Sequence, residues 1–314
     1  MKKNNTINGF VIPAKAGICL IILLTLTLFT STSFAKLNIF TCEPEWAALA
    51  SEIGGDKIKT FSATHGKQDP HFIQARPSLI AKIRKADLLV CTGAELEVGW
   101  LPLLLRKASN SHIQPGQEGN FVATSFVKLL DKPTRIDRSQ GDVHAGGNPH
   151  VQSDPRRMAE IAKKLSQRMQ QLDADNADFY QANTETFLSK WQQAIQRWQK
   201  QAEVLKGRKI IAHHKSWIYL SNWLGMEIIG YLEPKPGVPP TADHLSKLIK
   251  IAKNNQVDMI IYAAYQNPKS AKWLHKRTDI PAVELPFTIG GTKNASNLFG
   301  LIDDTINRMV EVVK

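Results

Sequence analysis

Three of the nine histidines in this chain of 314 residues fall at positions suited to metal binding. His71, His150 and His214 each lie in a loop at or near the end of an expected strand or helix. Three neutral imidazoles that converge on one point make a good site for zinc, which binds nitrogen ligands tetrahedrally at about 2.0–2.1 Å. A lone histidine is more often a polar surface or core residue, so spacing alone leaves this convergence open.

The other histidines are less informative. His112, His244 and His275 lie in polar or helical segments, where we expect structural roles. His65, followed by Gly66, allows either interpretation. His144 belongs to the same glycine-rich segment as His150, and an expected helix begins just after it at Asp154-Pro155.

The elements that must position these histidines alternate between strand and helix. In the first half they are expected at residues 37–41, 45–53, 57–61, 78–85 and 87–90. Such alternation is typical of a mostly parallel sheet flanked by helices, which collects ligands at the carboxyl ends of its strands. His71 follows the second of these strands, at that edge.

The second half repeats this architecture without an obvious sequence repeat. Strands are expected at 208–212, 226–231, 258–262 and 282–285, and helices at 216–224, 241–254 and 297–313. His213 and His214 follow the first of these strands. The sequence therefore predicts an α/β fold of two lobes, each with a mostly parallel sheet.

A long amphipathic helix over residues 173–206 separates the two halves. Its apolar stripe consists of Phe179, Phe187, Trp191, Ile195, Trp198, Ala202 and Leu205. We predict a rigid connector between an N-terminal lobe (36–172) and a C-terminal lobe (207–314) that close a site between them. An ordinary long surface helix is the alternative.

The first 35 residues are typical of a secretory signal peptide. Lysines precede an apolar run over residues 16–29, and Ser33-Phe34-Ala35 supplies small residues for cleavage after about Ala35. The run is short of the roughly 20 residues that span a membrane. Lipid attachment at Cys19 is disfavoured, because Ile18 stands where a small residue is expected.

The predicted export also argues against nucleic-acid binding as the reason for the positive net charge. Removing three lysines and no acidic residues lowers the net charge from +12 to +9. Nucleic-acid binding is disfavoured, because the protein is exported and its cations are spread over helix faces rather than gathered with aromatics in one patch.

The two cysteines of the mature chain are candidates for a disulfide. Cys42 and Cys91 each end a strand-like run, so parallel neighbouring strands would bring both sulfurs to one edge of the sheet. A disulfide is plausible in an exported protein. A pair of thiolates in a metal site is the alternative, although neither cysteine has a C-x-x-C partner.

Three ordered motifs resemble the zinc/manganese ABC-transporter solute-binding family (cluster A-I, or cluster 9), in its zinc-type branch. They are Asp69-Pro70-His71 with Arg76-Pro77-Ser78 and residues 86–93, then Asn148 to Pro155, then His214 to Leu220 with Gly225. The similarity covers essentially the whole mature chain, and the family's interlobe connector falls on the long helix.

The resemblance implies a ligand set. His71 and His150 would be ligands from the first lobe and His214 from the second, with His213 a neighbour that is not a ligand. Many members add an Asp from the loop after the last strand, but residues 285–291 contain no acid and Glu284 lies within the strand-like run. Water or His144 would complete the site, which favours zinc over manganese, a metal that prefers oxygen ligands.

The function implied is periplasmic capture of zinc and its delivery to an ABC permease in the inner membrane, by a monomer that binds and releases without chemistry. Glu95 and Glu97 are candidates for supporting the ligands or contacting the permease, although exposed helical acids are the commoner case. A secreted zinc hydrolase is one alternative, but the chain has no H-E-x-x-H or G-x-S-x-G motif. A binding protein for a metal chelate such as haem or a siderophore is the other.

Overall fold

The computed structural model describes residues 1–2, 36–134, 141 and 144–313. The predicted signal peptide, including Cys19 and its cleavage site, lies outside the described residues except for its first two. Among the helices of the described part, none has both the length and the apolar character needed to cross a bilayer.

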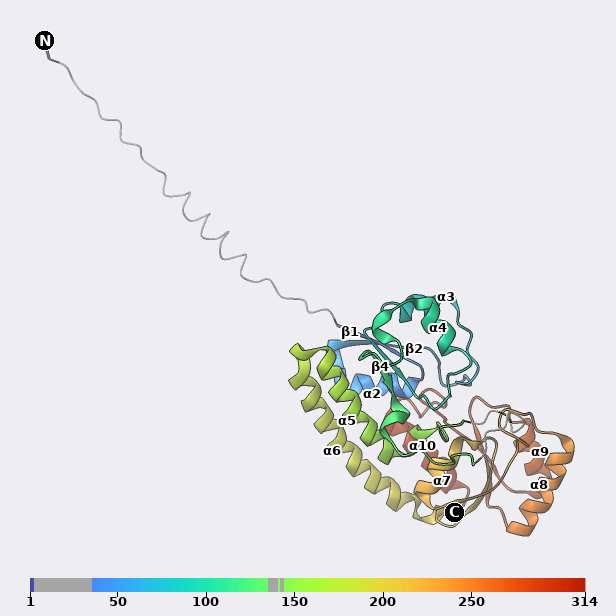
Figure 1. Cartoon of the computed structure of the whole chain (residues 1–314). Helices are drawn as coiled ribbons and strands as arrows, with labels where there is room; N and C mark the ends of the chain where they lie inside the picture. The colour runs from blue at the N-terminus through green and yellow to red at the C-terminus, as the bar shows by residue number, and fades with distance from the viewer. Residues whose placement is uncertain (3–35, 135–140, 142–143, 314) are drawn as a thin grey trace. The chain divides into compact units, whose positions relative to one another are not determined.

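The first lobe is built on a sheet of four parallel strands in the order β2-β1-β3-β4. Its elements in chain order are β1 (Leu37–Thr41), α2 (Pro44–Gly54), β2 (Ile58–Ser62), α3 (Pro77–Ile83), β3 (Leu88–Cys91), α4 (Leu101–Ala108), β4 (Asn120–Val122) and α5 (Pro155–Leu172). Figure 1 shows this sheet with α3 and α4 over one side and α2 and α5 toward the other.

The second lobe has the same plan, with four parallel strands in the order β6-β5-β7-β8. Its elements are β5 (Lys209–Ala212), α7 (Ile218–Leu224), β6 (Glu227–Tyr231), α8 (Ala242–Asn255), β7 (Met259–Ala263), α9 (Lys269–Thr278), β8 (Ala282–Leu285) and α10 (Leu298–Glu311). The α/β prediction of two parallel sheets is thus confirmed.

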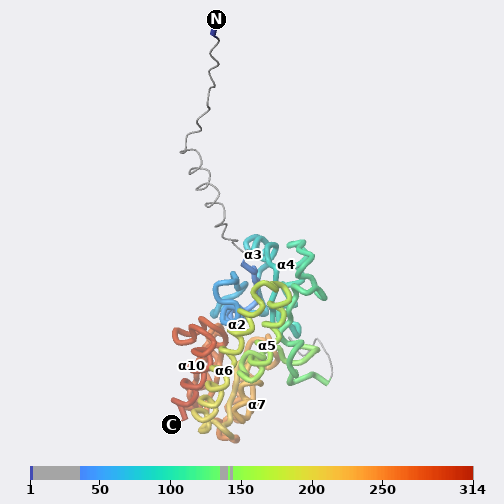
Figure 2. The backbone as a smooth tube through the Cα atoms, turned by 90° about the vertical axis from the view of Figure 1, so that its left-hand side faces the viewer, coloured from blue at the N-terminus to red at the C-terminus, as the bar shows by residue number. Residues whose placement is uncertain are grey.

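The connector is α6 (Ala177–Gln201), extended by single 3-10 turns over Ala174–Asn176 and Ala202–Leu205. It runs beside α5, and α10 lies along its second half (Figures 1 and 2). The indole N–H of Trp191 donates to the carbonyl of Pro155 at 2.7 Å, and that of Trp198 to Asp303 Oδ1 at 2.7 Å. The same helix is therefore bonded to both lobes.

The apolar stripe of the connector faces a core shared by the lobes. Every stripe residue except the half-buried Phe179 is buried, and Tyr180 and Thr184 are buried with them. One continuous apolar cluster contains residues of α2, of α6 and of α10. The stripe is thus an internal packing surface, as expected of a connector rather than of a surface helix.

Three elements of the structure were not predicted. The helix α4 buries Leu104, Leu105 and Ala108 at helical spacing, but it has only eight residues and begins with the apolar run Leu-Pro-Leu-Leu-Leu, which hides that spacing. The strand β4 has only three residues after a glycine-rich turn. The helix α9 is dominated by basic residues, and only Ala271 and Leu274 are buried. The local pattern of each is short or hidden, so it gave no clear prediction.

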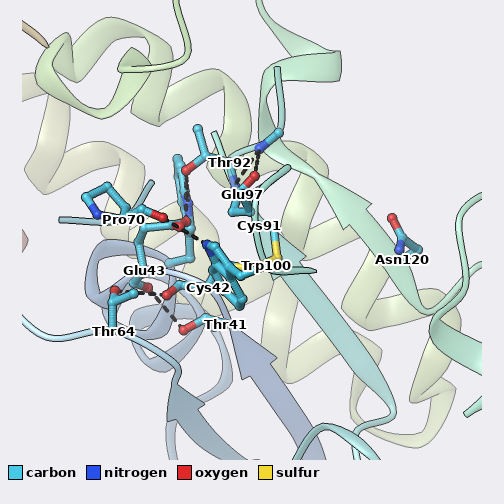
Figure 3. The surroundings of a disulfide bond; sticks show 12 residues. Thr41, Cys42, Glu43, Thr64, Pro70, Cys91, Thr92, Glu97, Trp100 and Asn120 are labelled. Atoms are coloured by element: carbon cyan, nitrogen blue, oxygen red, sulfur yellow. Dashed lines mark hydrogen bonds between the residues drawn. A yellow bond between two sulfur atoms is a disulfide. The ribbon is translucent and has the colours of Figure 1, made fainter. Parts of the chain in front are cut away.

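A disulfide joins Cys42 and Cys91 across β1 and β3, with the Cα atoms 4.8 Å apart, so the first of the two alternatives left open by the sequence holds. Both cysteines are buried, at the carboxyl edge of the sheet (Figure 3). The carbonyl of Cys42 accepts hydrogen bonds from the backbone N–H and the hydroxyl of Thr64, which begins the loop that carries His71. The cross-link therefore fixes the base of that loop.

Candidate metal site

His71 lies in the loop between β2 and α3, at the predicted edge of the first sheet. Its Nδ1 is 2.7 Å from Asp69 Oδ1, which also accepts the backbone N–H of His71 at 3.0 Å. The indole N–H of Trp100 donates to the carbonyl of Pro70 at 2.9 Å (Figure 3). Asp69 therefore orients the imidazole and Trp100 anchors the residue before it, while Nε2 of the ring is buried without a hydrogen-bond partner.

His150 lies just before α5, whose N-cap is Asp154, as predicted. Its backbone N–H donates to Asn148 Oδ1 at 3.0 Å, and Asn148 Nδ2 donates to the carbonyl of Lys215 in the second lobe at 2.8 Å. The side chain of His150 is 0% exposed, and neither of its ring nitrogens has a partner. Burying polar atoms in this way is costly unless something binds them.

His214 follows β5 and enters from the second lobe. Its Nδ1 is 2.7 Å from Glu233 Oε2, and the same oxygen accepts the backbone N–H of Gly237 at 3.0 Å. The neighbouring His213 has Nε2 3.8 Å from Glu233 Oε1 and is also buried.

His144 lies in the glycine-rich segment, next to residues outside the described part. The backbone N–H of Ala145 donates to Glu95 Oε2 at 2.6 Å, which attaches this segment to the turn after β3. In that turn Ala94 and Glu95 have φ angles of 48° and 67°, which residues other than glycine rarely adopt. Glu97 stabilises the turn by accepting the N–H of Thr92 at 2.8 Å.

The four rings converge. Their centroids are 5.5 Å apart for His71 and His150, 5.5 Å for His71 and His214, and 5.6 Å for His150 and His214. His144 is 5.6 Å from His71 and 6.3 Å from His150, and ligand nitrogens of these three residues all lie within 4.8 Å of one another. Nitrogens around a tetrahedral zinc would be about 3.4 Å apart, so small inward shifts would complete the site.

The loop after β8 closes the site with an aromatic wall. The ring of Phe287 is 5.4 Å from that of His150 and 5.2 Å from that of Tyr265. Glu284 lies within β8, where its Oε1 is 3.9 Å from Lys67 Nζ. Glu284 therefore contacts Lys67, and residues 285–291 contain no acidic residue.

A pocket of about 70 Å³ opens beside the histidines, between segments of the two lobes. Its lining residues are Asp131, Pro133, His144, Asn148, His214, Lys215 and Pro236. An ion pair between Lys215 Nζ and Asp131 Oδ2, 3.0 Å long, spans it. Two of the four clustered histidines, His144 and His214, therefore line this pocket.

Burial keeps two of the imidazoles neutral. Burial first, and the neighbouring histidines second, lower the pKa of His144 to about 4 and the pKa of His150 well below its usual value. Burial alone would raise the pKa of Asp69, but the side-chain and backbone hydrogen bonds from His71, together with the nearby histidine charges, outweigh it and hold this pKa below its usual value. Neutral nitrogens beside ionised carboxylates are the forms that bind a cation.

These shifts predict how the metal-free protein responds to acid. Because the folded-state pKa of His144 lies below that of the unfolded chain, the unfolded state binds the proton first and stability falls as pH drops below about 6.5. Between pH 7.5 and 5.0 the free energy of unfolding should fall by about 2 kcal/mol more in the wild type than in His144→Gln.

Urea unfolding in the presence of a chelator measures this difference. The comparison with the variant is needed because burial raises the pKa of Glu45 and of Glu97 to about 7. Those carboxyl groups favour the folded state as pH falls, which is the opposite sign. Parallel pH profiles for wild type and variant would contradict the prediction.

The interpretation of Glu97 needs revision, and two acidic residues that contact the histidines were not predicted. Glu97 is not an exposed helical acid, since it is 3% exposed and holds the turn after β3 from inside. Asp69 and Glu233, which contact the imidazoles of His71 and His214, were not singled out from the sequence. Asp69 lies two residues from its histidine, but Glu233 is 19 residues away and has no local signal.

Comparison with known proteins identifies the class. The chain matches the model of the family described as zinc-uptake complex component A, periplasmic (ZnuA), over residues 39–312. It belongs to this family.

Particular relatives are distant in sequence. The manganese ABC transporter substrate-binding lipoprotein PsaA of Streptococcus pneumoniae is 23% identical over 265 residues, which cover 82% of each chain. The high-affinity zinc uptake system protein ZnuA of Bacillus subtilis is 23% identical over 239 residues, covering 76% of this chain and 74% of the relative.

Solved structures share the fold. A crystal structure of ZnuA superposes with a TM-score of 0.71 at 22% identity, covering 88% of this chain and all of that one. The substrate-binding protein FpvC of Pseudomonas aeruginosa in complex with Mn²⁺ gives 0.75 at 19% identity, covering 89% and 99%. The two-lobe fold of this chain is therefore shared with these solved structures.

Proposed function

We propose that this protein captures a divalent transition metal, zinc in the first place, between its two lobes and delivers it to an ABC permease. The ligands would be His71, His150 and His214, with His144 as the fourth. The observation that carries this proposal is His150, whose imidazole is fully buried with both nitrogens unpaired among three other histidines. A metal bond would offset the cost of that burial.

The donor set supports zinc over manganese. Imidazole nitrogens suit zinc, whereas manganese prefers carboxylate, carbonyl and water oxygens. The carboxylates nearest to the cluster, Asp69 and Glu233, each contact an imidazole Nδ1. Relatives are named for zinc and for manganese, so the choice of metal in this chain rests on its own ligands.

Binding and release, rather than hydrolysis, suits this arrangement. In a zinc hydrolase a free carboxylate beside the metal-bound water acts as general base, and Asp69 and Glu233 are engaged with histidines instead. A chelate-binding protein would need a wide cleft, whereas four converging rings with centroids 5.5–6.3 Å apart fit a bare ion.

The place of action would be the periplasm, with the protein acting as a monomer after cleavage behind about Ala35. PsaA and other relatives are named lipoproteins, whereas the sequence around Cys19 disfavours lipid attachment in this chain. The exported protein would therefore be free to shuttle between metal and permease.

Metal titration of the mature wild-type protein tests the proposal. After removal of metal with a chelator, the protein should bind one zinc per chain, with an affinity at least 100-fold higher than for manganese. Competition with a chromophoric chelator measures both constants. Failure to bind either ion would refute metal capture, and tighter binding of manganese would refute the zinc assignment.

A further inference from the structure

Two carboxylates lie directly behind two of the proposed ligands, one in each lobe. Asp69 Oδ1 is 2.7 Å from His71 Nδ1, and Glu233 Oε2 is 2.7 Å from His214 Nδ1. A carboxylate only accepts hydrogen bonds, so each Nδ1 must carry the proton. The lone pair of each ring is then on Nε2, the nitrogen that is buried and unpaired in His71.

Both carboxylates are themselves held in place. Asp69 Oδ1 also accepts the backbone N–H of His71, at 3.0 Å, and Glu233 Oε2 also accepts that of Gly237, at 3.0 Å. Glu233 and Gly237 both belong to the proline-rich loop after β6 (residues 233–240), so this hydrogen bond fixes the carboxylate within its own loop. Neither ring can therefore turn about its long axis without breaking a hydrogen bond to a fixed acceptor.

Charge gives the pair a second role. Four neutral imidazoles contribute no charge, so a bound Zn²⁺ would leave two positive charges in a largely buried site, where the electrostatic energy of an unbalanced ion is high. Asp69 and Glu233 together carry two negative charges. His144 and His150 have no carboxylate hydrogen-bonded to their rings among the described residues.

Resting on the proposed function, we infer that Asp69 and Glu233 are the positioning and charge-balancing residues of the metal site. They orient His71 and His214 with Nε2 toward the ion, and they supply the two negative charges that make an all-histidine site selective for divalent cations. Each lobe thus contributes one ligand–carboxylate pair to the closed site.

The test compares amide and alanine variants in the mature protein. Asp69→Asn and Glu233→Gln keep an oxygen that can accept the Nδ1–H but remove the charge, and each should weaken zinc binding by about 10- to 100-fold. The double amide variant should lose at least about 100-fold. Alanine variants remove the hydrogen bond to the imidazole as well as the charge, so the ring can turn. They should therefore also change the visible spectrum of bound Co²⁺, whereas the amide variants should leave this spectrum unchanged.

A matched control separates this effect from net charge. Asp243→Asn makes the same change in charge at an exposed ion pair with Lys247, and its zinc affinity should stay within about threefold of the wild type. Zinc-free unfolding midpoints of all variants are measured alongside. They should agree within about 2 °C, which excludes general loss of structure.

A monovalent ion isolates the charge-balancing role. Since Coulomb energy is proportional to ionic charge, the amide variants should lose about half as many log units of affinity for Ag⁺ as for Zn²⁺. Equal losses would overturn charge balancing, and amide and alanine variants that all bind zinc as the wild type does would overturn the inference as a whole. A wild type that binds no zinc would instead refute the proposed function.

Discussion

The triple variant His71→Ala/His150→Ala/His214→Ala should lose at least 10⁴-fold in zinc affinity while keeping its fold. Structural zinc sites bind with about 10–16 kcal/mol, or about 3 kcal/mol per ligand when shared among four, and 1.4 kcal/mol is a tenfold change. Removing three ligands therefore leaves a site too weak to hold zinc at micromolar concentrations. Competitive titration and metal analysis of the purified protein measure the loss.

An equal number of histidines can be removed elsewhere as a control. His65, His112 and His275 are exposed and lie outside the cluster of four rings, so the triple alanine variant at these positions should bind zinc as the wild type does. Equal affinity of the wild type and the site variant would place the zinc somewhere else. It would also move the chelate-binding alternative to first place.

Single variants should rank the ligands. His150→Ala should cost about 100-fold or more, because this residue is fully buried and its position is fixed by Asn148. His144→Ala should cost less, about 10-fold, because water can replace a ligand at the position facing the pocket. An effect of His144→Ala as large as that of His150→Ala would make all four histidines equal ligands.

The local features of this fold were predictable because each follows from a short-range pattern. The strand that delivers His214, the N-cap at Asp154 and the stripe on α6 are all visible within a window of one element. The disulfide also followed, because parallel pairing of β1 and β3 puts Cys42 and Cys91 at the same edge.

What the sequence did not reveal depends on contacts between distant segments. Glu233 meets His214 because the parallel register of β5 and β6, which pairs Ala212 with Tyr231, continues past the ends of both strands. That neighbour becomes visible only once the pairing of the two strands is known. Glu97 looked like an exposed acid because carboxylates are rarely buried, yet the turn after β3 folds it inward, where it accepts the backbone N–H of Thr92. A side chain that supports a site is recognised by its contacts in the folded protein. Its residue type, here glutamate, occurs at many other positions and does not distinguish it.

A substitution in the connector should lower the stability of the fold without changing the free energy of zinc binding. Trp198→Ala is expected to cost about 3–5 kcal/mol of stability and to lower the melting temperature by roughly 10 °C. Trp198 is 0% exposed, its ring centroid is 5.0 Å from that of Trp191, and its N–H bonds to Asp303 of α10. The substitution therefore opens a cavity where the connector meets the second lobe and removes one hydrogen bond from Asp303, which keeps its ion pair with Arg197.

Zinc binding supplies the second readout. No ligand is touched by Trp198→Ala, so zinc at 100 times its dissociation constant should still stabilise the variant by about 2.7 kcal/mol, as it should the wild type. Trp273→Ala is the matched control, because that tryptophan is only half-buried against Arg277 on α9, and it should cost about 1 kcal/mol. Equal losses at the two tryptophans would mean that α6 is an ordinary surface helix. A Trp198→Ala variant that no longer gains stability from zinc would mean that the connector itself sets the distance between His214 and the ligands of the first lobe.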